Sequence, residues 1–261
     1  MKLHTEGLYI SYENQKNIVK DLNLSILEGK ITAFIGANGS GKSTILKTIA
    51  RILKPDQGSV VLDGKNIHTM NTKEVSKLLT LLPQNPDSPE GLTVDELVAY
   101  GRIPHRGAFS PLTKEDREIM DWAQKVTNVY DFKDRPLNRL SGGQRQRVWI
   151  AMAVAQSTDI LFLDEPTTFL DIAHQMEVLN LLQELNKQSN RTIVMVLHDL
   201  NQAAQYADYI VAIKDGTVVK EGVPKEVITP EVCAKVFGIK ADIVINEKTN
   251  TPLCIPYGLY K

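Results

Sequence analysis

The chain alternates between short apolar runs and longer amphipathic stretches, a pattern that predicts strands alternating with helices. Apolar residues at Leu22, Leu24 and Ile26 alternate with polar ones, which predicts a half-buried strand in an antiparallel N-terminal part. Further β-type runs are predicted at residues 31–35, 58–62, 78–82, 160–163 and 193–197, with a final hairpin at 210–220. The runs at 160–163 and 193–197 are almost wholly apolar, as expected of strands buried on both faces of a parallel sheet.

Between residues 84 and 158 the pattern changes to that of helices. Thr93 precedes Glu96 by three residues, and Thr113 precedes Asp116 by three, so each threonine can cap a helix. We therefore predict a helical subdomain, at about residues 85–158, inserted in an α/β core that spans residues 1–240. A short helix is expected from residue 229 to 238, and residues 241–261 form a C-terminal tail in which no chemistry is evident.

Composition narrows the possible classes of protein. The 261 residues include 30 Lys and Arg against 31 Asp and Glu, so no overall basic field indicates a nucleic-acid partner. The longest apolar stretch, residues 148–155, is far short of the roughly 20 residues of a membrane helix, and no signal peptide is evident. Cys233 and Cys254 are the only cysteines and have no metal-ligand spacing. These features predict a cytosolic protein whose membrane contacts are made through partners.

Residues 36–44 carry the strongest chemical signal, because they fit the glycine-rich loop that surrounds the phosphates of a nucleotide. The loop follows a predicted strand and precedes a predicted helix at residues 43–52, which is the order that the motif requires. Its glycines expose backbone N–H groups, Lys42 can reach the β- and γ-phosphates, and the Ser43 hydroxyl can bind Mg²⁺. The predicted nucleotide-binding residues are Gly36, Ala37, Asn38, Gly39, Ser40, Gly41, Lys42, Ser43 and Thr44.

Two adjacent carboxylates, Asp164 and Glu165, follow the apolar run at 160–163. Because neighbouring side chains of a strand point in different directions, one acid can face a metal ion while the next faces a water molecule. We predict that Asp164 binds Mg²⁺ and that Glu165 polarises the attacking water in nucleotide hydrolysis.

A second anion site is predicted at the start of the helix that begins near residue 142. Ser141 and Gln144 have the spacing of a capping box, and two glycines leave the first-turn N–H groups uncovered. A simple helix cap would explain Ser141 and Gln144 but does not require two glycines. Since the chain already has a phosphate loop, this surplus site suggests that Ser141, Gly142, Gly143 and Gln144 serve the nucleotide of another subunit.

Taken together, residues 36–44, 140–144 and 160–166 resemble the motifs of ABC-type ATPase subunits, in the order and spacing of that family. The resemblance extends from Leu3 to about Gly222. It implies an α/β fold of the P-loop NTPase type, ATP and Mg²⁺ as cofactors, and a homodimer in which each signature helix caps the ATP of the other subunit.

Four further residues take roles from this resemblance. It implies that Tyr12 stacks on adenine, that Gln84 contacts Mg²⁺ and the attacking water, and that His198 senses the γ-phosphate. Residues 168–171, which end at Asp171, match the loop that communicates across the dimer, and Phe169 in this loop replaces a residue that is usually small. The remaining histidines (His4, His68, His105 and His174) are interpreted as surface or packing residues, and Trp149 as a core residue.

The absence of fused membrane helices, long coiled coils, zinc modules and a second cassette favours a separate subunit that serves membrane permeases. Residues 81–85, 91–107 and 135–140 are similar to ATPases of bacterial ferric-siderophore, haem and cobalamin importers, among which we favour ferric siderophores. The implied partners are permease subunits and, indirectly, a substrate-binding lipoprotein, at the cytoplasmic face of the cell membrane. A soluble nucleotide-switched regulator without a permease is the alternative from another class.

Overall fold

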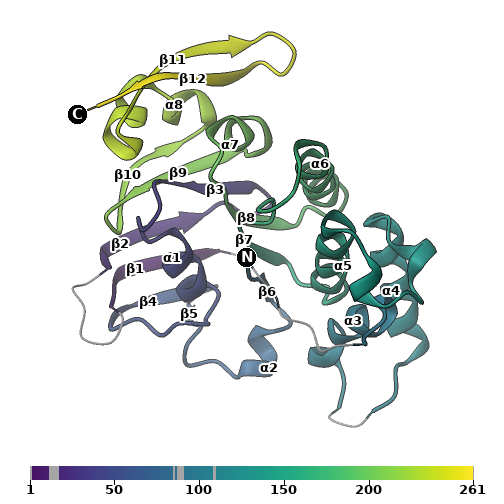
Figure 1. Ribbon diagram of the computed structural model, residues 1–261. Helices are drawn as coiled ribbons and strands as arrows, with labels where there is room; N and C mark the ends of the chain where they lie inside the picture. Colours follow the sequence, from purple (N-terminus) through teal and green to yellow (C-terminus); the bar gives the residue numbers. More distant parts are fainter. Residues whose placement is uncertain (1, 12–17, 85, 87–90, 108–109, 261) are drawn as a thin grey trace.

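Helix α1 (Lys42–Ile49) lies between two β-sheets (Figure 1). The chain was analysed as a computed structural model that describes residues 2–11, 18–84, 86, 91–107 and 110–260. The larger sheet has six strands, in the order β10 (Thr217–Gly222), β9 (Tyr209–Lys214), β3 (Ile31–Ile35), β8 (Thr192–Val196), β7 (Ile160–Asp164) and β6 (Leu79–Leu82). Only the pairing of β10 with β9 is antiparallel, and the other pairings are parallel.

The smaller sheet is antiparallel, as the N-terminal alternation predicts. Its order is β2 (Val19–Ile26), β1 (Leu3–Ile10), β4 (Gln57–Leu62) and β5 (Lys65–Asn66). A separate pair, β11 (Ile239–Asn246) and β12 (Thr251–Leu259), forms an antiparallel hairpin from residues that the sequence analysis assigns largely to a tail. The predicted α/β fold class is confirmed.

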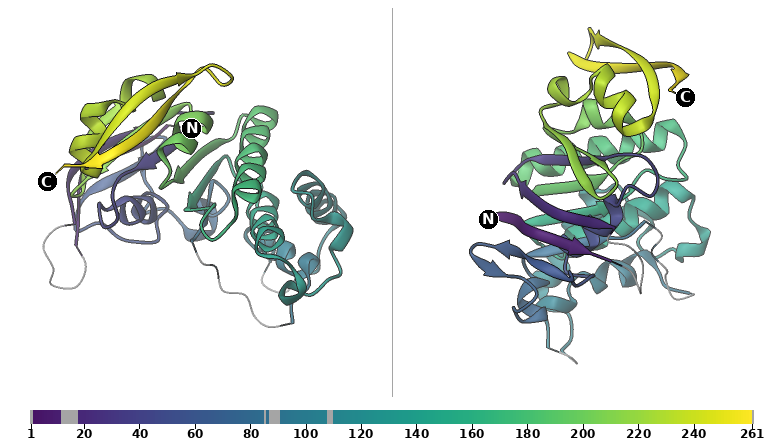
Figure 2. Two further views of the ribbon diagram at one scale, coloured as in Figure 1. Left: turned by 45° about the horizontal axis from the view of Figure 1, so that its top comes forward. Right: turned by 90° about the vertical axis from the view of Figure 1, so that its left-hand side faces the viewer.

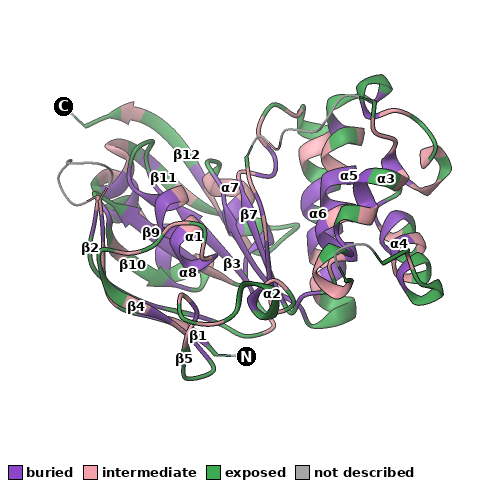
Figure 3. Ribbon diagram, turned by 90° about the horizontal axis from the view of Figure 1, so that it is seen from below, coloured by how far each residue is buried: buried purple, intermediate pink, exposed green. Residues whose placement is uncertain are grey.

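The strands of the larger sheet divide their side chains between two hydrophobic cores. Phe34 and Phe162 join α1 and the antiparallel sheet in one core, whereas Ala33 and Leu163 face the helices on the other side. Figure 3 shows the buried strands between these layers.

The other helices are α2 (Thr72–Val75), α3 (Val94–Tyr100), α4 (Lys114–Val126), α5 (Gly142–Ala155), α6 (Ile172–Ser189), α7 (Leu200–Tyr206), α8 (Pro224–Val227) and α9 (Pro230–Val232). Short 3₁₀ turns occupy Ile103–His105, Tyr130–Phe132 and Leu137–Arg139, and a π turn occupies Cys233–Phe237. None of the described helices combines the length and apolarity needed to cross a bilayer.

Helices α3, α4 and α5 pack together to one side of the large sheet (Figures 1 and 2). Thr93, Thr113 and Ser141 cap them through the predicted capping boxes. Gly101 ends α3, but in a right-handed conformation (φ −58°) rather than a left-handed one. The glycine is instead required by packing, because a Cβ there would lie 2.3 Å from the carbonyl oxygen of Met152 on α5.

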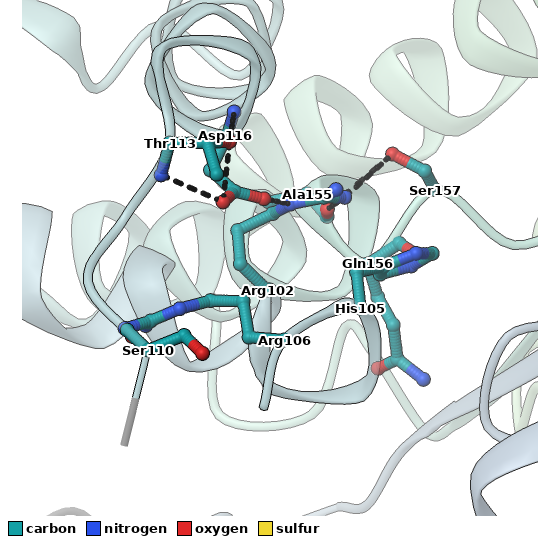
Figure 4. A network of polar contacts seen from close by, with 9 residues as sticks. All are labelled: Arg102, His105, Arg106, Ser110, Thr113, Asp116, Ala155, Gln156 and Ser157. Carbon is teal, nitrogen blue, oxygen red and sulfur yellow. Dashed lines mark hydrogen bonds and ion pairs between the residues drawn. The ribbon is translucent and has the colours of Figure 1, made fainter. Parts of the chain in front are cut away.

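A buried ion pair joins these three helices (Figure 4). Arg102 and Asp116 are both 4% exposed, and the Arg102 Nε donates to Asp116 at 2.8 Å. Arg102 also donates to the carbonyl of Ala155 at the end of α5 and to the Ser157 hydroxyl. Burial alone would raise the pKa of Asp116, but hydrogen bonds from Thr113 and Arg102 outweigh it and lower the pKa to about 2.

We predict that Asp116→Asn lowers the free energy of unfolding at neutral pH by about 3 kcal/mol, because it leaves the Arg102 charge buried without its partner. Urea denaturation measures the change. The control is Glu118→Gln, which removes one partner of the exposed Lys114–Glu118 pair and should change stability by less than about 0.5 kcal/mol.

The Arg102–Asp116 pair also predicts how the stability of the protein depends on pH. The folded-state pKa of Asp116 is depressed, so its stabilisation is complete above the unfolded value of 3.8 and is lost as the pH falls towards about 2. The difference between wild type and Asp116→Asn should therefore shrink over this window. A difference that stays constant from pH 7 to pH 2.5 would contradict the assignment.

Candidate functional site

The phosphate loop connects the buried strand β3 to helix α1. Gly41 is the N-cap of α1, in a left-handed conformation (φ 100°) that favours glycine, and no side chain caps the first turn. Gly36 approaches another strand closely, since a Cβ there would lie 2.2 Å from the carbonyl oxygen of Ile213. The helix begins one residue before the predicted start and ends at Ile49, three residues before the predicted end. Its uncovered N–H groups and N-terminal dipole are suited to bind an anion.

The ammonium group of Lys42 lies folded against this loop. Its Nζ donates to the carbonyl oxygens of Gly36 at 2.9 Å and Ala37 at 3.0 Å, and the residue is only 5% exposed. Burial lowers the pKa of Lys42, while the charges of Glu165 and Asp164 act in the opposite direction. Since phosphate oxygens carry full negative charge, they are stronger acceptors for this cation than the two carbonyls.

Asp164 and Ser43 meet at the end of strand β7. The Ser43 hydroxyl donates to the Asp164 carboxylate at 2.7 Å, and Lys47 on α1 lies 3.6 Å from its second oxygen. Oxygen ligands suit Mg²⁺, which commonly binds one or two carboxylates together with substrate phosphates. The described residues contain no group of three or more His, Cys, Asp and Glu that could hold a metal without such phosphates. The Ser43 hydroxyl and the Asp164 carboxylate are oxygen ligands of the kind that fits a magnesium ion bound together with nucleotide phosphates.

Glu165 directly follows the strand, with a left-handed backbone (φ 53°). This conformation, rather than the alternation of an extended strand, separates its side chain from that of Asp164. One Glu165 oxygen lies 2.5 Å from His198 Nε2, and the other accepts hydrogen bonds from Gln84 Nε2 and, at 3.0 Å, from the Thr168 hydroxyl. Both oxygens of the carboxylate are thus engaged by groups from three different loops.

One cavity of about 480 Å³ lies between the phosphate loop and Glu165. Its lining contains Lys42 and Ser43 from the phosphate loop together with Gln84, Glu165 and His198, residues far apart in the sequence. Strand register explains the convergence: Phe34 pairs with Val196, and Val196 pairs with Asp164, so β3, β8 and β7 end side by side. Functional groups of parallel sheets gather at such a carboxyl edge.

The predicted signature residues lie apart from this cavity, at the start of α5. Ser141 Oγ accepts from the N–H of Gln144 at 3.2 Å, and the Gln144 side chain accepts from the N–H of Ser141 at 3.1 Å. Packing explains Gly143, because a Cβ there would lie 2.4 Å from the ring of His174. Packing does not explain Gly142, because among the described residues a Cβ there would meet only the Leu170 side chain, at 3.9 Å.

Asp171 caps helix α6 and holds the His174 ring at 2.8 Å. None of Ser141, Gly142, Gly143, Gln144 and Asp171 lines the cavity of the phosphate loop. Tyr12 falls outside the described residues. The structure therefore brings together the residues predicted to act on the phosphates, while those predicted to serve a partner lie elsewhere on the chain.

The residues predicted to have no chemical role occupy packing or surface positions. Trp149 is 8% exposed, and His105 bonds the carbonyl oxygen of Gln156. Sequence analysis placed Thr168 in the loop at 168–171 but missed the contact of its hydroxyl with Glu165, and it missed Lys47, which neutralises Asp164. A threonine three residues after the glutamate and a lysine one helical turn after Ser43 are the only signals that could have indicated them.

Comparison with known proteins identifies the family. The ABC transporter family model matches residues 19–168. The chain is 55% identical to the iron(3+)-hydroxamate import ATP-binding protein FhuC of Bacillus subtilis, over 99% of this chain and 96% of the relative. It is 44% identical to the ferric enterobactin transport ATP-binding protein FepC of Escherichia coli, over 98% and 94% respectively.

Solved structures agree with this assignment. The chain resembles an inward-facing metal-chelate type ABC transporter with a TM-score of 0.85 and 28% identity, over 98% of this chain and 96% of that one. It also resembles the dimeric ABC transporter cassette MJ0796 with a TM-score of 0.74 and 31% identity, over 85% and 98%. The chain belongs to the ABC transporter family and is an ABC-type ATPase.

Proposed function

We propose that this ATPase energises the uptake of ferric siderophores by a bacterial importer. Two copies would form a dimer beneath permease subunits, at the cytoplasmic face of the cell membrane, and a substrate-binding lipoprotein would deliver the cargo to the permease. The cargo assignment is supported by the relatives, whose names include iron(3+)-hydroxamate import, petrobactin import and ferric enterobactin transport.

The observation that carries the ATPase mechanism is the engagement of Glu165 by Gln84 and His198 beside Lys42 and Ser43 in one cavity. ATP phosphates would replace the two loop carbonyls as hydrogen-bond acceptors of the Lys42 ammonium group. Ser43 and Asp164 would hold Mg²⁺, which neutralises phosphate charge when bound. The γ-phosphate would attract His198 away from Glu165, and the released carboxylate would then orient a water molecule for attack.

The second anion site supports a composite active site. Ser141 and Gly142 are exposed at a helix N-terminus outside the cavity, followed by the buried Gly143, so a nucleotide held on the same chain's phosphate loop does not need them. We infer that they complete the site of the second copy, and that Asp171 contributes to the same interface.

Replacing Glu165 by Gln should preserve ATP binding and reduce turnover by at least about 100-fold, because the amide keeps the shape but loses the charge that polarises water. Phosphate release measures turnover, and size-exclusion chromatography in saturating ATP and Mg²⁺ should show a trapped dimer. Turnover near the wild-type rate would remove Glu165 from its proposed role, and a monomer in this assay would count against the composite site.

Ser141→Arg should spare ATP binding to the separated subunit but abolish cooperative hydrolysis, because the side chain fills the space intended for the partner's γ-phosphate. Ser141→Ala is the control: it removes the cap, at a cost of about 1 kcal/mol, without adding bulk. Mixing Ser141→Arg with Lys42→Ala leaves one intact composite site in the mixed dimer and should restore part of the activity. Loss of ATP binding in Ser141→Arg alone would mean that the signature acts within its own chain.

The cargo is tested by uptake of radiolabelled iron as a ferric siderophore, under iron limitation, in wild-type, deletion and Gln84→Ala strains. We expect no uptake in the deletion strain. The Gln84→Ala strain should lose more uptake than the purified variant loses basal ATPase activity. Lost haem or cobalamin uptake with unchanged iron uptake would reassign the cargo, and unchanged uptake of all three would contradict the importer assignment.

A further inference from the structure

The C-terminal hairpin is anchored on the ATPase core through one of its faces. Ala241, Pro252 and Cys254 are buried, and the Cys254 sulfur lies 3.7 Å from that of Cys233. Burial raises the pKa of the Cys233 thiol to about 12, so this pair remains neutral and packs as an apolar contact. Figures 1 and 2 show the hairpin beside α7 and α8, and strand β12 contacts both helices.

A single side chain on α7 joins this hairpin to the helix. The Asn201 amide accepts a hydrogen bond from the backbone N–H of Cys254 at 2.7 Å and donates to the carbonyl oxygen of the same residue at 3.2 Å. The amide thus pairs with both polar groups of one strand residue, as a neighbouring strand would. This contact ties the first turn of α7 to the hairpin.

Helix α7 begins directly behind His198. Asp199 caps it by accepting from the N–H groups of Asn201 at 2.7 Å and Gln202 at 3.0 Å. The helix has only seven residues, so its position depends on the groups that hold it from outside. A displacement of α7 would change the 2.5 Å approach of His198 to Glu165.

The other side of α7 is tied to the loop that leads from Glu165 to α6. Gln202 donates to the side-chain oxygen of Gln175 at 2.5 Å, and Gln175 donates to the carbonyl oxygen of Leu170 at 2.9 Å. All three contacts (hairpin, α7 cap and Gln175) therefore act on the short helix that follows His198.

We propose that the C-terminal hairpin is a positioning element for ATP hydrolysis, and that Asn201 is the positioning residue through which it holds α7 and His198. This inference rests on the role of His198 in the proposed function. Positioning errors of about 0.5 Å are enough to impair a catalytic site, whereas nucleotide binding by the phosphate loop does not involve α7.

Asn201→Ala tests the proposal in the full-length protein. Loss of two hydrogen bonds should lower kcat about three- to ten-fold, while the Kd for ATP stays within about two-fold of the wild-type value. Asn201→Asp is a near-isosteric second variant. It should also lower kcat without changing the Kd for ATP, because its carboxylate cannot donate to the Cys254 carbonyl. Lys225→Ala is the control, since it removes the exposed contact of Lys225 with Asn250 in the hairpin without touching α7.

His198→Ala, measured in parallel, separates this inference from the proposed function. Wild-type kcat in His198→Ala would remove the role of His198 itself. A reduced kcat in His198→Ala with wild-type kcat in both Asn201 variants would overturn the positioning role of the hairpin. Equal losses of kcat and thermal stability in Lys225→Ala and Asn201→Ala would also overturn it, because the effect would then be general destabilisation.

Discussion

The structure depends on the parallel alignment of strands β3, β8, β7 and β6. Because these strands run in the same direction and in register, the loops that follow them meet at one edge of the sheet. The first loop contributes Lys42 and Ser43, and the others contribute Gln84, Glu165 and His198. Each strand is buried on both faces, so the positions of these groups are set by two hydrophobic cores rather than by the loops themselves.

Charge balance at this edge of the sheet explains the arrangement of the site. The carbonyl oxygens of Gly36 and Ala37 satisfy the Lys42 cation, and His198, Gln84 and Thr168 satisfy the Glu165 carboxylate. Buried charged groups without partners are costly, so these contacts stabilise the site before ATP binds. In the proposed mechanism, they would also keep Glu165 from acting on water until ATP competes for its partners.

Sequence alone was sufficient where local patterns determine the structure. The apolar runs predicted the strands of the large sheet, and the Thr93, Thr113 and Ser141 caps marked the starts of three helices. Sequence alone was insufficient where a contact joins residues that are far apart along the chain. Gly143 leaves room for His174, and Asn201 bonds Cys254, 53 residues away. The sequence analysis left 241–261 as a tail, yet residues 251–259 form a strand that includes Pro252 and Pro256, because the edges of a two-stranded hairpin tolerate proline.

The central claim is that the strand ends form one ATP site in which Lys42 neutralises the phosphates. Calorimetric titration of ATP, at fixed Mg²⁺, into wild type, Lys42→Ala and the exposed control Lys54→Ala tests it most directly. Removal of a charge-assisted contact worth about 2 kcal/mol or more should weaken binding at least about 30-fold in Lys42→Ala and leave Lys54→Ala unchanged. Wild-type affinity in Lys42→Ala would contradict the account.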